Sequence, residues 1–271
     1  MPTAPHEFTL DAAARTGGIV AAGRATQIVE HLNAGRPLRI AVLGASVAIN
    51  GGCTHQPTAA CADFSGQRHV RMAPWRSSAA PHKGFFVRWL DWINASWPHD
   101  EHRLHNNAIG ASNIGAWLPC LFAHLPPLLD LVVLELGSMA HWQRLPWIET
   151  LARKLRSMRP SPVVLFLTVP LWHDLPARTD WQRTRCAVVN GTRMAKKMDR
   201  QLRQQTGAAH ARESWALVER QIDRVCEHYG EACLSMRRAL GPGARAERAG
   251  FSLGEIAADC LHPNTGSLGT E

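Results

Sequence analysis

Short apolar runs that alternate with stretches of helical periodicity constrain the fold more than any other feature of this sequence. Five segments are expected to be strands: Leu38–Leu43, Arg103–Asn106, Asp130–Leu136, Val163–Val169 and Ala232–Met236. Strands that alternate with helices pair in parallel, because each crossover helix returns the chain to the same end of the sheet. The sequence therefore predicts an α/β fold with three layers, α/β/α, around a mostly parallel sheet of about five strands.

Helical periodicity marks the segments between these strands. Phe85, Trp89 and Ile93 recur at helical spacing and predict a first amphipathic helix. Three further segments with helical character are Pro146–Met158, Thr184–Thr206 and Ala211–His228. Functional residues of such a fold are expected at the carboxyl ends of the strands.

The chain of 271 residues is long enough for one sizeable domain, and no break in composition indicates a second. We therefore expect a single domain over residues 1–271. Residues of about 52–83 form a polar stretch without periodicity, which predicts an insertion or a lid. The apolar runs are far shorter than the roughly 20 residues that cross a bilayer, so no transmembrane helix is expected.

The net charge of +8 permits an acidic partner but does not require one. The Arg and Lys residues are dispersed along the chain, and no basic motif interleaved with aromatic residues accompanies them. We interpret the positive charge as solvated helix faces and expect no nucleic-acid partner. The sequence does not indicate an oligomeric state.

Seven cysteines are an odd number, so at least one thiol is free or pairs outside the chain. Cys53 and Cys61 flank a short polar loop and could form a disulfide in an oxidising compartment. The sequence has no Cys-x-x-Cys pair, and its histidines lack the spacing of metal ligands. No metal site is therefore expected.

The sequence does not determine the cellular compartment of the protein. Two glycosylation sequons, at Asn94 and Asn190, weakly favour secretion. The N-terminus, however, lacks the apolar stretch of a signal peptide.

A candidate nucleophile, Ser46, follows the first expected strand in the run Gly44-Ala45-Ser46. Small residues at such a place often serve only a tight turn between strand and helix. The run Asp259-Cys260-Leu261-His262-Pro263 near the other end of the chain strengthens the catalytic interpretation. An Asp that accepts the Nδ1 proton of His262 would leave Nε2 free to deprotonate a serine hydroxyl.

Four short blocks together resemble the SGNH hydrolase family, also called GDSL-type esterases. The blocks are Gly44–Ser46, Asn106–Ser112, Leu134–Ala140 and Asp259–Pro263, in the order of the family. The resemblance covers about residues 38–266, and the last block matches the family's Asp-x-x-His-Pro in full. It implies the flavodoxin-like SGNH hydrolase fold, Ser46 as nucleophile, His262 as general base, Asp259 as its orienting partner, and no cofactor.

The resemblance also implies an oxyanion hole. Its backbone donors would be the N–H groups of Ser46 and of Gly110 or Ala111, depending on the alignment. The family's third block reads Gly-x-Asn-Asp, and Met139 stands in place of the asparagine, although a thioether donates no hydrogen bond. The expected substrate contacts near this block are Ser138, Met139, His141 and Trp142. The candidate replacement donors are Ser138, His141 and Asn113.

These residues predict a serine ester hydrolase that works through an acyl-enzyme, on O-acetylated carbohydrate or on a small ester. Two alternatives stay open. The missing asparagine favours a weakened member of the family that binds glycans without turnover. An O-acyltransferase could use the same triad. The chain ends soon after His262, where a closing helix is expected, so the sequence could be part of a longer one.

Overall fold

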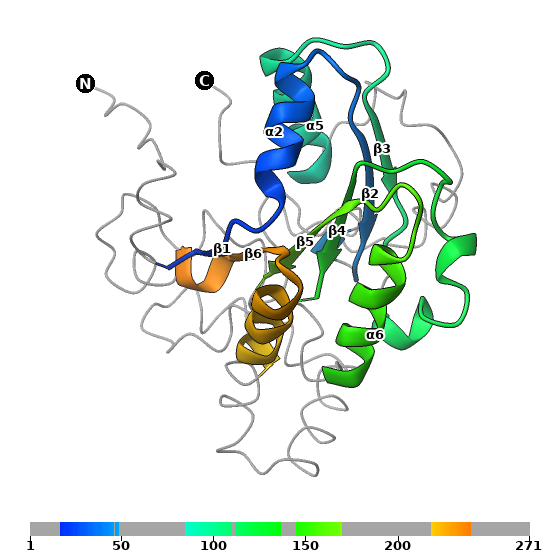
Figure 1. Ribbon diagram of the computed structural model, residues 1–271, viewed down its shortest axis with the longest axis vertical. Helices are drawn as coiled ribbons and strands as arrows, with labels where there is room; N and C mark the ends of the chain where they lie inside the picture. The colour runs from blue at the N-terminus through cyan, green and yellow to red at the C-terminus, as the bar shows by residue number, and fades with distance from the viewer. Residues whose placement is uncertain are drawn as a thin grey trace, which may run out of the picture.

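A six-stranded sheet forms the centre of the protein (Figure 1). The computed structural model describes residues 17–45, 47–48, 85–109, 112–136, 145–169 and 218–239. The strand order is β1-β6-β5-β4-β2-β3. The strands are β1 (Ile19–Ala21), β2 (Arg39–Leu43), β3 (Arg103–Asn106), β4 (Leu131–Glu135), β5 (Val163–Thr168) and β6 (Ala232–Ser235). All five expected strands are present at the expected places.

The sheet is mostly parallel, as the alternation of strands and helices predicts. The strands β2 to β6 pair with their neighbours in parallel, and β1 pairs with β6 in the antiparallel direction. The sequence did not indicate β1, which adds a sixth strand to the expected five. Three residues are too few to show a strand pattern, so only the pairing with β6 reveals this strand.

Helices cover both faces of the sheet. They are α2 (Ala25–Asn33), α5 (Phe85–Ser96), α6 (Leu145–Arg156) and a helix at 218–229. The predictions of α5 and α6 are confirmed, and the helix at 218–229 overlaps the expected helix Ala211–His228. The sequence did not indicate α2. The polar stretch at 52–83 and the expected helix Thr184–Thr206 lie outside the described residues.

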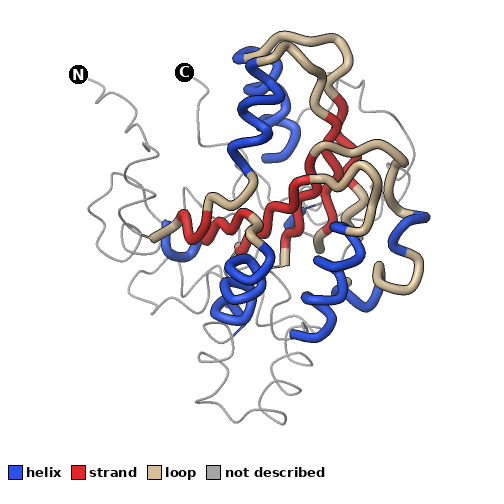
Figure 2. The backbone as a smooth tube through the Cα atoms, in the orientation of Figure 1, coloured by secondary structure: helices blue, strands red, loops and turns tan. Residues whose placement is uncertain are grey.

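The core has two parts, one on each face of the sheet. In β2, Ile40 and Val42 pack with α2 and α5, whereas Ala41 and Leu43 pack with α6 and the helix at 218–229. Figure 2 shows the same division, with the sheet passing between the two groups of helices. The strands are apolar at nearly every position because both of their faces are buried.

A buried carboxylate holds the amino edge of the sheet together. Glu231, directly before β6, has no exposed surface and accepts hydrogen bonds from Arg24 and Arg156 at 2.8 Å each. Its other oxygen accepts from the backbone N–H of Val164 at 3.2 Å. The carboxylate thus links the segment before α2, helix α6 and two neighbouring strands. Two cations and a backbone donor offset the free energy of burying this charge.

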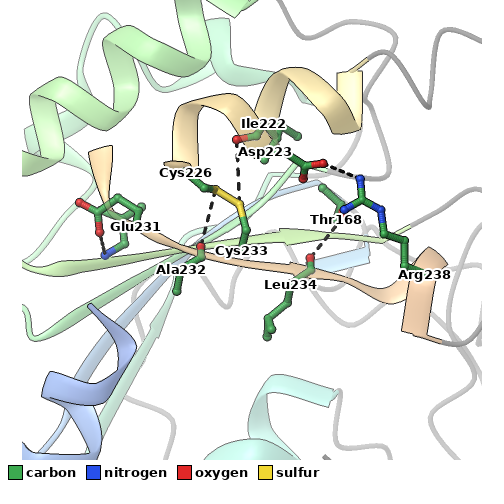
Figure 3. The surroundings of a disulfide bond; sticks show 10 residues. Thr168, Ile222, Asp223, Cys226, Glu231, Ala232, Cys233, Leu234 and Arg238 are labelled. Atoms are coloured by element: carbon green, nitrogen blue, oxygen red, sulfur yellow. Dashed lines mark hydrogen bonds and ion pairs between the residues drawn. A yellow bond between two sulfur atoms is a disulfide. The ribbon is translucent and has the colours of Figure 1, made fainter. Parts of the chain in front are cut away.

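A disulfide joins the helix at 218–229 to the sheet (Figure 3). It links Cys226 to Cys233 of β6, whose Cα atoms lie 6.1 Å apart. Among the described residues Cys120 is a free and exposed thiol. The expected pair Cys53 and Cys61 lies outside the described residues.

In the described part of the chain, no helix combines the length and the apolar content that crossing a bilayer demands.

The arginine cluster around Glu231 generates a stability prediction. Replacing the residue by Gln (Glu231→Gln) removes the negative charge and leaves two arginines against a neutral group, so the free energy of unfolding should fall by about 3 kcal/mol. The measurement is urea denaturation followed by circular dichroism.

The matched control is Glu149→Gln, because Glu149 forms an exposed pair with Arg153 at 3.9 Å on helix α6. The glutamine oxygen can still accept from the Tyr229 hydroxyl, which donates to Glu149 at 3.0 Å. This change should lower the free energy of unfolding by less than about 1 kcal/mol. Equal losses in the two variants would contradict the role assigned to Glu231.

Candidate active site

Three strand ends meet at the carboxyl edge of the sheet, and each leads into one of the blocks found in the sequence. Strand β2 lies between β3 and β4, with Val42 opposite Asn106 and Leu43 opposite Leu134. Parallel strands in this register end at the same edge, which is where α/β proteins place their functional residues. The described parts of the first three blocks therefore lie side by side.

Most of the predicted site residues lie outside the described residues. These are Ser46, Gly110, Ala111, Ser138, Met139, His141, Trp142, Asp259 and His262. Their roles stay predictions. The structure does describe the residues that flank several of them, and these flanks define the backbone at the site.

A backbone hydrogen bond joins the described residues on either side of position 46. The backbone N–H of Ala48 donates to the carbonyl oxygen of Ala45 at 3.1 Å, which closes a turn of four residues. Helical geometry begins directly after position 46, at Val47. A strand, a glycine and the first turn of a helix thus follow one another, as the block Gly44–Ser46 predicts.

Gly44 is required by close packing. A Cβ atom at this position would lie 2.5 Å from the Cβ of Ala48 and 2.8 Å from the Cβ of Glu135. Neither neighbour can rotate out of the way, because a Cβ is fixed by the backbone. The first glycine of the block therefore lets β2 and the following helical turn approach the end of β4.

The carboxylate of Glu135 contacts the same turn from β4. It accepts a hydrogen bond from the backbone N–H of Ala45 at 3.3 Å. Glu135 is 1% exposed and Ala45 is 2% exposed, so this contact is shielded from water. A buried N–H that lost its acceptor would destabilise the turn by about 1–3 kcal/mol.

Asn106, the last residue of β3, contacts the turn from the other side. Its Nδ2 donates to the carbonyl oxygen of Ala48 at 2.7 Å, and its Oδ1 accepts from the N–H of Ala108 at 3.1 Å. The N–H of Ile109 donates to the carbonyl oxygen of Gly44 at 2.9 Å. The first and second blocks are therefore joined by both side-chain and backbone hydrogen bonds.

The described residues on either side of positions 110 and 111 are also joined by hydrogen bonds. The N–H of Ser112 donates to the carbonyl oxygen of Ile109 at 3.2 Å, and the Ser112 hydroxyl donates to the same oxygen at 2.5 Å. Asn113 follows, and its Oδ1 accepts from the N–H of Gly115 at 2.9 Å. This bond caps the short helix η2 (Ile114–Ala116) and fixes the orientation of the Asn113 amide.

The sequence patterns alone indicate no role for Glu135 or Asn106. A signal for Glu135 was present, because a single acid stands inside the apolar run Asp130–Leu136. A charged residue in a strand that is buried on both faces needs specific partners. Asn106 was part of the second block, but only the tertiary structure shows that it reaches Ala48.

A second polar cluster lies at the carboxyl end of β6. Glu219 is 4% exposed and accepts hydrogen bonds from the Ser235 hydroxyl and from Arg237. Next to it Asp223 accepts from Arg238 at 2.5 Å, a contact drawn in Figure 3. Burial raises the pKa of Asp223, and the contact with Arg238 opposes this shift. The acids and the arginines are paired, so the cluster stabilises the helix at 218–229 against β6.

Within the described ranges, no group of three His, Cys, Asp or Glu side chains is arranged to hold a metal ion. His105 of β3 is the histidine nearest in sequence to the second block. Burial, together with the positive charge of Arg103, lowers the pKa of His105 from its usual value of 6.5.

The order of the strands, the two helical layers and the glycine turn after β2 define a protein with the SGNH hydrolase fold. A two-domain esterase active on acetylated mannans, crystallised with mannopentaose, has a similar structure, with a TM-score of 0.56 and 19% sequence identity. The match covers 92% of this chain and 52% of that protein, so the chain spans about half the length of the esterase. The fold that the resemblance implied is therefore confirmed.

Phospholipase A1 from Streptomyces albidoflavus also matches, with a TM-score of 0.47 and 15% identity over 84% of this chain and 93% of the lipase. No family model matches the sequence, and no curated protein is significantly similar to it.

The packing around Gly44 predicts that Gly44→Ala destabilises the protein. The added methyl group would force the helical turn away from Glu135, and overpacking of this kind lowers the free energy of unfolding by about 1–3 kcal/mol. Thermal unfolding measures the effect. A melting temperature equal to that of the unchanged protein would contradict the close approach described here.

The lowered pKa of His105 predicts a dependence of stability on pH. Below pH 6.5 the unfolded chain binds a proton at this residue more readily than the folded protein does. Neutral His105 therefore makes its full contribution to the free energy of unfolding above pH 6.5. This contribution is lost as the pH falls through the lower pKa of the folded state. Urea denaturation between pH 7.5 and pH 5 should show a smaller loss of the free energy of unfolding in His105→Gln than in the unchanged protein. Identical losses in the two proteins would be evidence against the lowered pKa of His105.

Proposed function

We propose that the protein is a serine ester hydrolase in which Ser46 attacks the carbonyl carbon of an ester. His262 takes the proton of the hydroxyl and later returns a proton to the leaving alcohol, while Asp259 orients the imidazole. The product of the first step is an acyl-enzyme, which water then hydrolyses. The reaction needs no metal or organic cofactor.

One observation supports the proposal most strongly. The described residues in and beside the first three blocks are joined by hydrogen bonds at the carboxyl edge of the sheet. The residues on either side of position 46, Ala45 and Ala48, are joined by a backbone hydrogen bond, and Ile109, directly before positions 110 and 111, donates to Gly44. A nucleophile and an oxyanion hole must lie within a few ångströms of each other, because both contact the same ester group. Blocks that were only spaced by chance in the sequence would not be expected to meet in this way.

The proposed substrate is an O-acetylated carbohydrate, with small esters as the alternative. The structural neighbour with the same fold is described as active on acetylated mannans. Trp142, close to the third block in the sequence, is an expected contact for a sugar ring. Ser138, Met139 and His141 are the other proposed contacts with the substrate.

Met139 distinguishes this protein from the usual pattern of the family. Without the asparagine, the backbone donors of Ser46 and of Gly110 or Ala111 remain, and Ser138, His141 and Asn113 are the candidates for a replacement side-chain donor. Loss of one donor lowers the rate of such reactions by roughly 100 to 1000-fold. We therefore expect a slow hydrolase. The same substitution supports the second candidate function, a protein that binds glycans without turning them over.

Labelling with a fluorophosphonate tests the nucleophile. The unchanged protein should be labelled and should hydrolyse p-nitrophenyl acetate, while Ser46→Ala should lose the label and at least about 1000-fold of the activity. The matched control is Ser157→Ala, since Ser157 lies in an exposed turn after α6 and its hydroxyl donates to Lys154. This control should be labelled like the unchanged protein.

Labelling of Ser46→Ala, or turnover equal to that of the unchanged protein, would refute the assignment of Ser46. Binding of acetylated mannan with neither label nor turnover would favour the glycan-binding alternative. An acyltransferase would differ in its products, because acetyl groups would appear on an added sugar acceptor in preference to free acetate.

A further inference from the structure

We infer that Glu135 and Asn106 are positioning residues, which hold the turn around position 46 from its two sides. The inference rests on the proposed function, because it takes that turn to carry the nucleophile. Neither residue is proposed to touch the substrate.

Glu135 holds the chain before position 46. Its carboxylate ends β4 and accepts the N–H of Ala45 in a region closed to water. The carbonyl carbon of Ala45 is bonded to the nitrogen of the next residue. The orientation of Ala45 therefore limits where the N–H and the side chain of position 46 can lie.

Asn106 holds the chain after position 46. Its side-chain amide donates to the carbonyl oxygen of Ala48 and accepts from Ala108, so one group spans two blocks. Ala108 precedes the turn at positions 110 and 111, which would supply the second backbone donor. Asn106 thus couples the nucleophile turn to the proposed oxyanion donor.

The two contacts come from the two strands that pair with β2. Glu135 is the last residue of β4 and Asn106 is the last residue of β3. A displacement of about 1 Å in a reacting group can lower the rate 100-fold. This sensitivity should be large here, because Met139 removes the family's asparagine donor and leaves fewer groups to stabilise the oxyanion.

Glu231 provides a comparison within the same chain. It is also a buried carboxylate, but it lies at the amino edge of the sheet, among Arg24 and Arg156. Removing its charge should lower stability without changing the geometry at the carboxyl edge. A variant at Glu231 therefore separates a loss of stability from a loss of positioning.

The test compares Glu135→Leu, Glu135→Gln, Asn106→Asp and Glu231→Gln at a temperature where circular dichroism shows each to be folded. The readouts are kcat and KM for p-nitrophenyl acetate, the rate of fluorophosphonate labelling, and hydrogen exchange of the peptide that covers residues 43–48. Hydrogen exchange reports on the turn whether or not the protein is catalytically active.

The expected result has three parts. Glu135→Leu should lower kcat and the labelling rate at least about 10-fold with little change in KM, and exchange at residues 43–48 should be faster. Glu135→Gln should recover most of the rate, because its amide oxygen can still accept the N–H of Ala45. Asn106→Asp should also be slow, since an ionised carboxylate cannot donate to the carbonyl of Ala48. Glu231→Gln should lower the melting temperature and leave the rates unchanged.

Two outcomes would overturn the inference and leave the proposed function intact: Glu135→Leu reacting at the unchanged rate, or Glu135→Gln reacting as slowly as Glu135→Leu. If the unchanged protein shows neither turnover nor labelling, the proposed function is refuted. Hydrogen exchange alone would then test whether Glu135 and Asn106 hold the turn. Faster exchange at residues 43–48 in Glu135→Leu, but not in Glu231→Gln, would support the positioning role. Equal exchange in all variants would overturn it. If Glu135→Leu does not fold, Asn106→Asp is compared with Glu231→Gln, and an unchanged rate together with unchanged exchange at residues 43–48 in Asn106→Asp would overturn the inference.

Discussion

The parallel pairing of β2 with β3 on one side and β4 on the other is the interaction on which the rest of the structure depends. It brings the ends of three strands to one edge of the sheet, although the segments that follow them are far apart in the sequence. Because both faces of β2 are buried, a shift of one residue would move its side chains to the wrong face. The register at the site is therefore determined by the core.

Two buried acids lie at opposite edges of this sheet, and their surroundings differ. Glu231 at the amino edge accepts from two arginines, which offset its charge and join separate segments of the chain. Glu135 at the carboxyl edge contacts a backbone N–H in the glycine turn after β2. The first arrangement is typical of a structural ion cluster. The second lies next to the proposed nucleophile, which is why we assign it a role in positioning.

Much of the fold could be predicted because its strands are buried on both faces. Continuous apolar runs identified β4 and β5, and helical spacing of large side chains identified α5 and α6. Strand β1 was not predicted because it is too short to show a pattern. Helix α2 was not predicted because it is a short surface helix. The disulfide between Cys226 and Cys233 was also missed, because the pairing of cysteines depends on distances in space. The triad of Ser46, Asp259 and His262 stays a prediction from sequence resemblance, and the structure describes only the residues that flank position 46.

The sequence by itself determined the type of fold and the order of most of its elements, and it predicts the residues with the chemistry of an ester hydrolase. These properties depend on local patterns of apolar and reactive side chains, which can be read along one chain. The tertiary structure alone decided which backbone groups meet at the carboxyl edge, including the contacts of Glu135 with Ala45 and of Asn106 with Ala48. Such contacts join residues that are far apart in the sequence, so they exist only once the strands have paired.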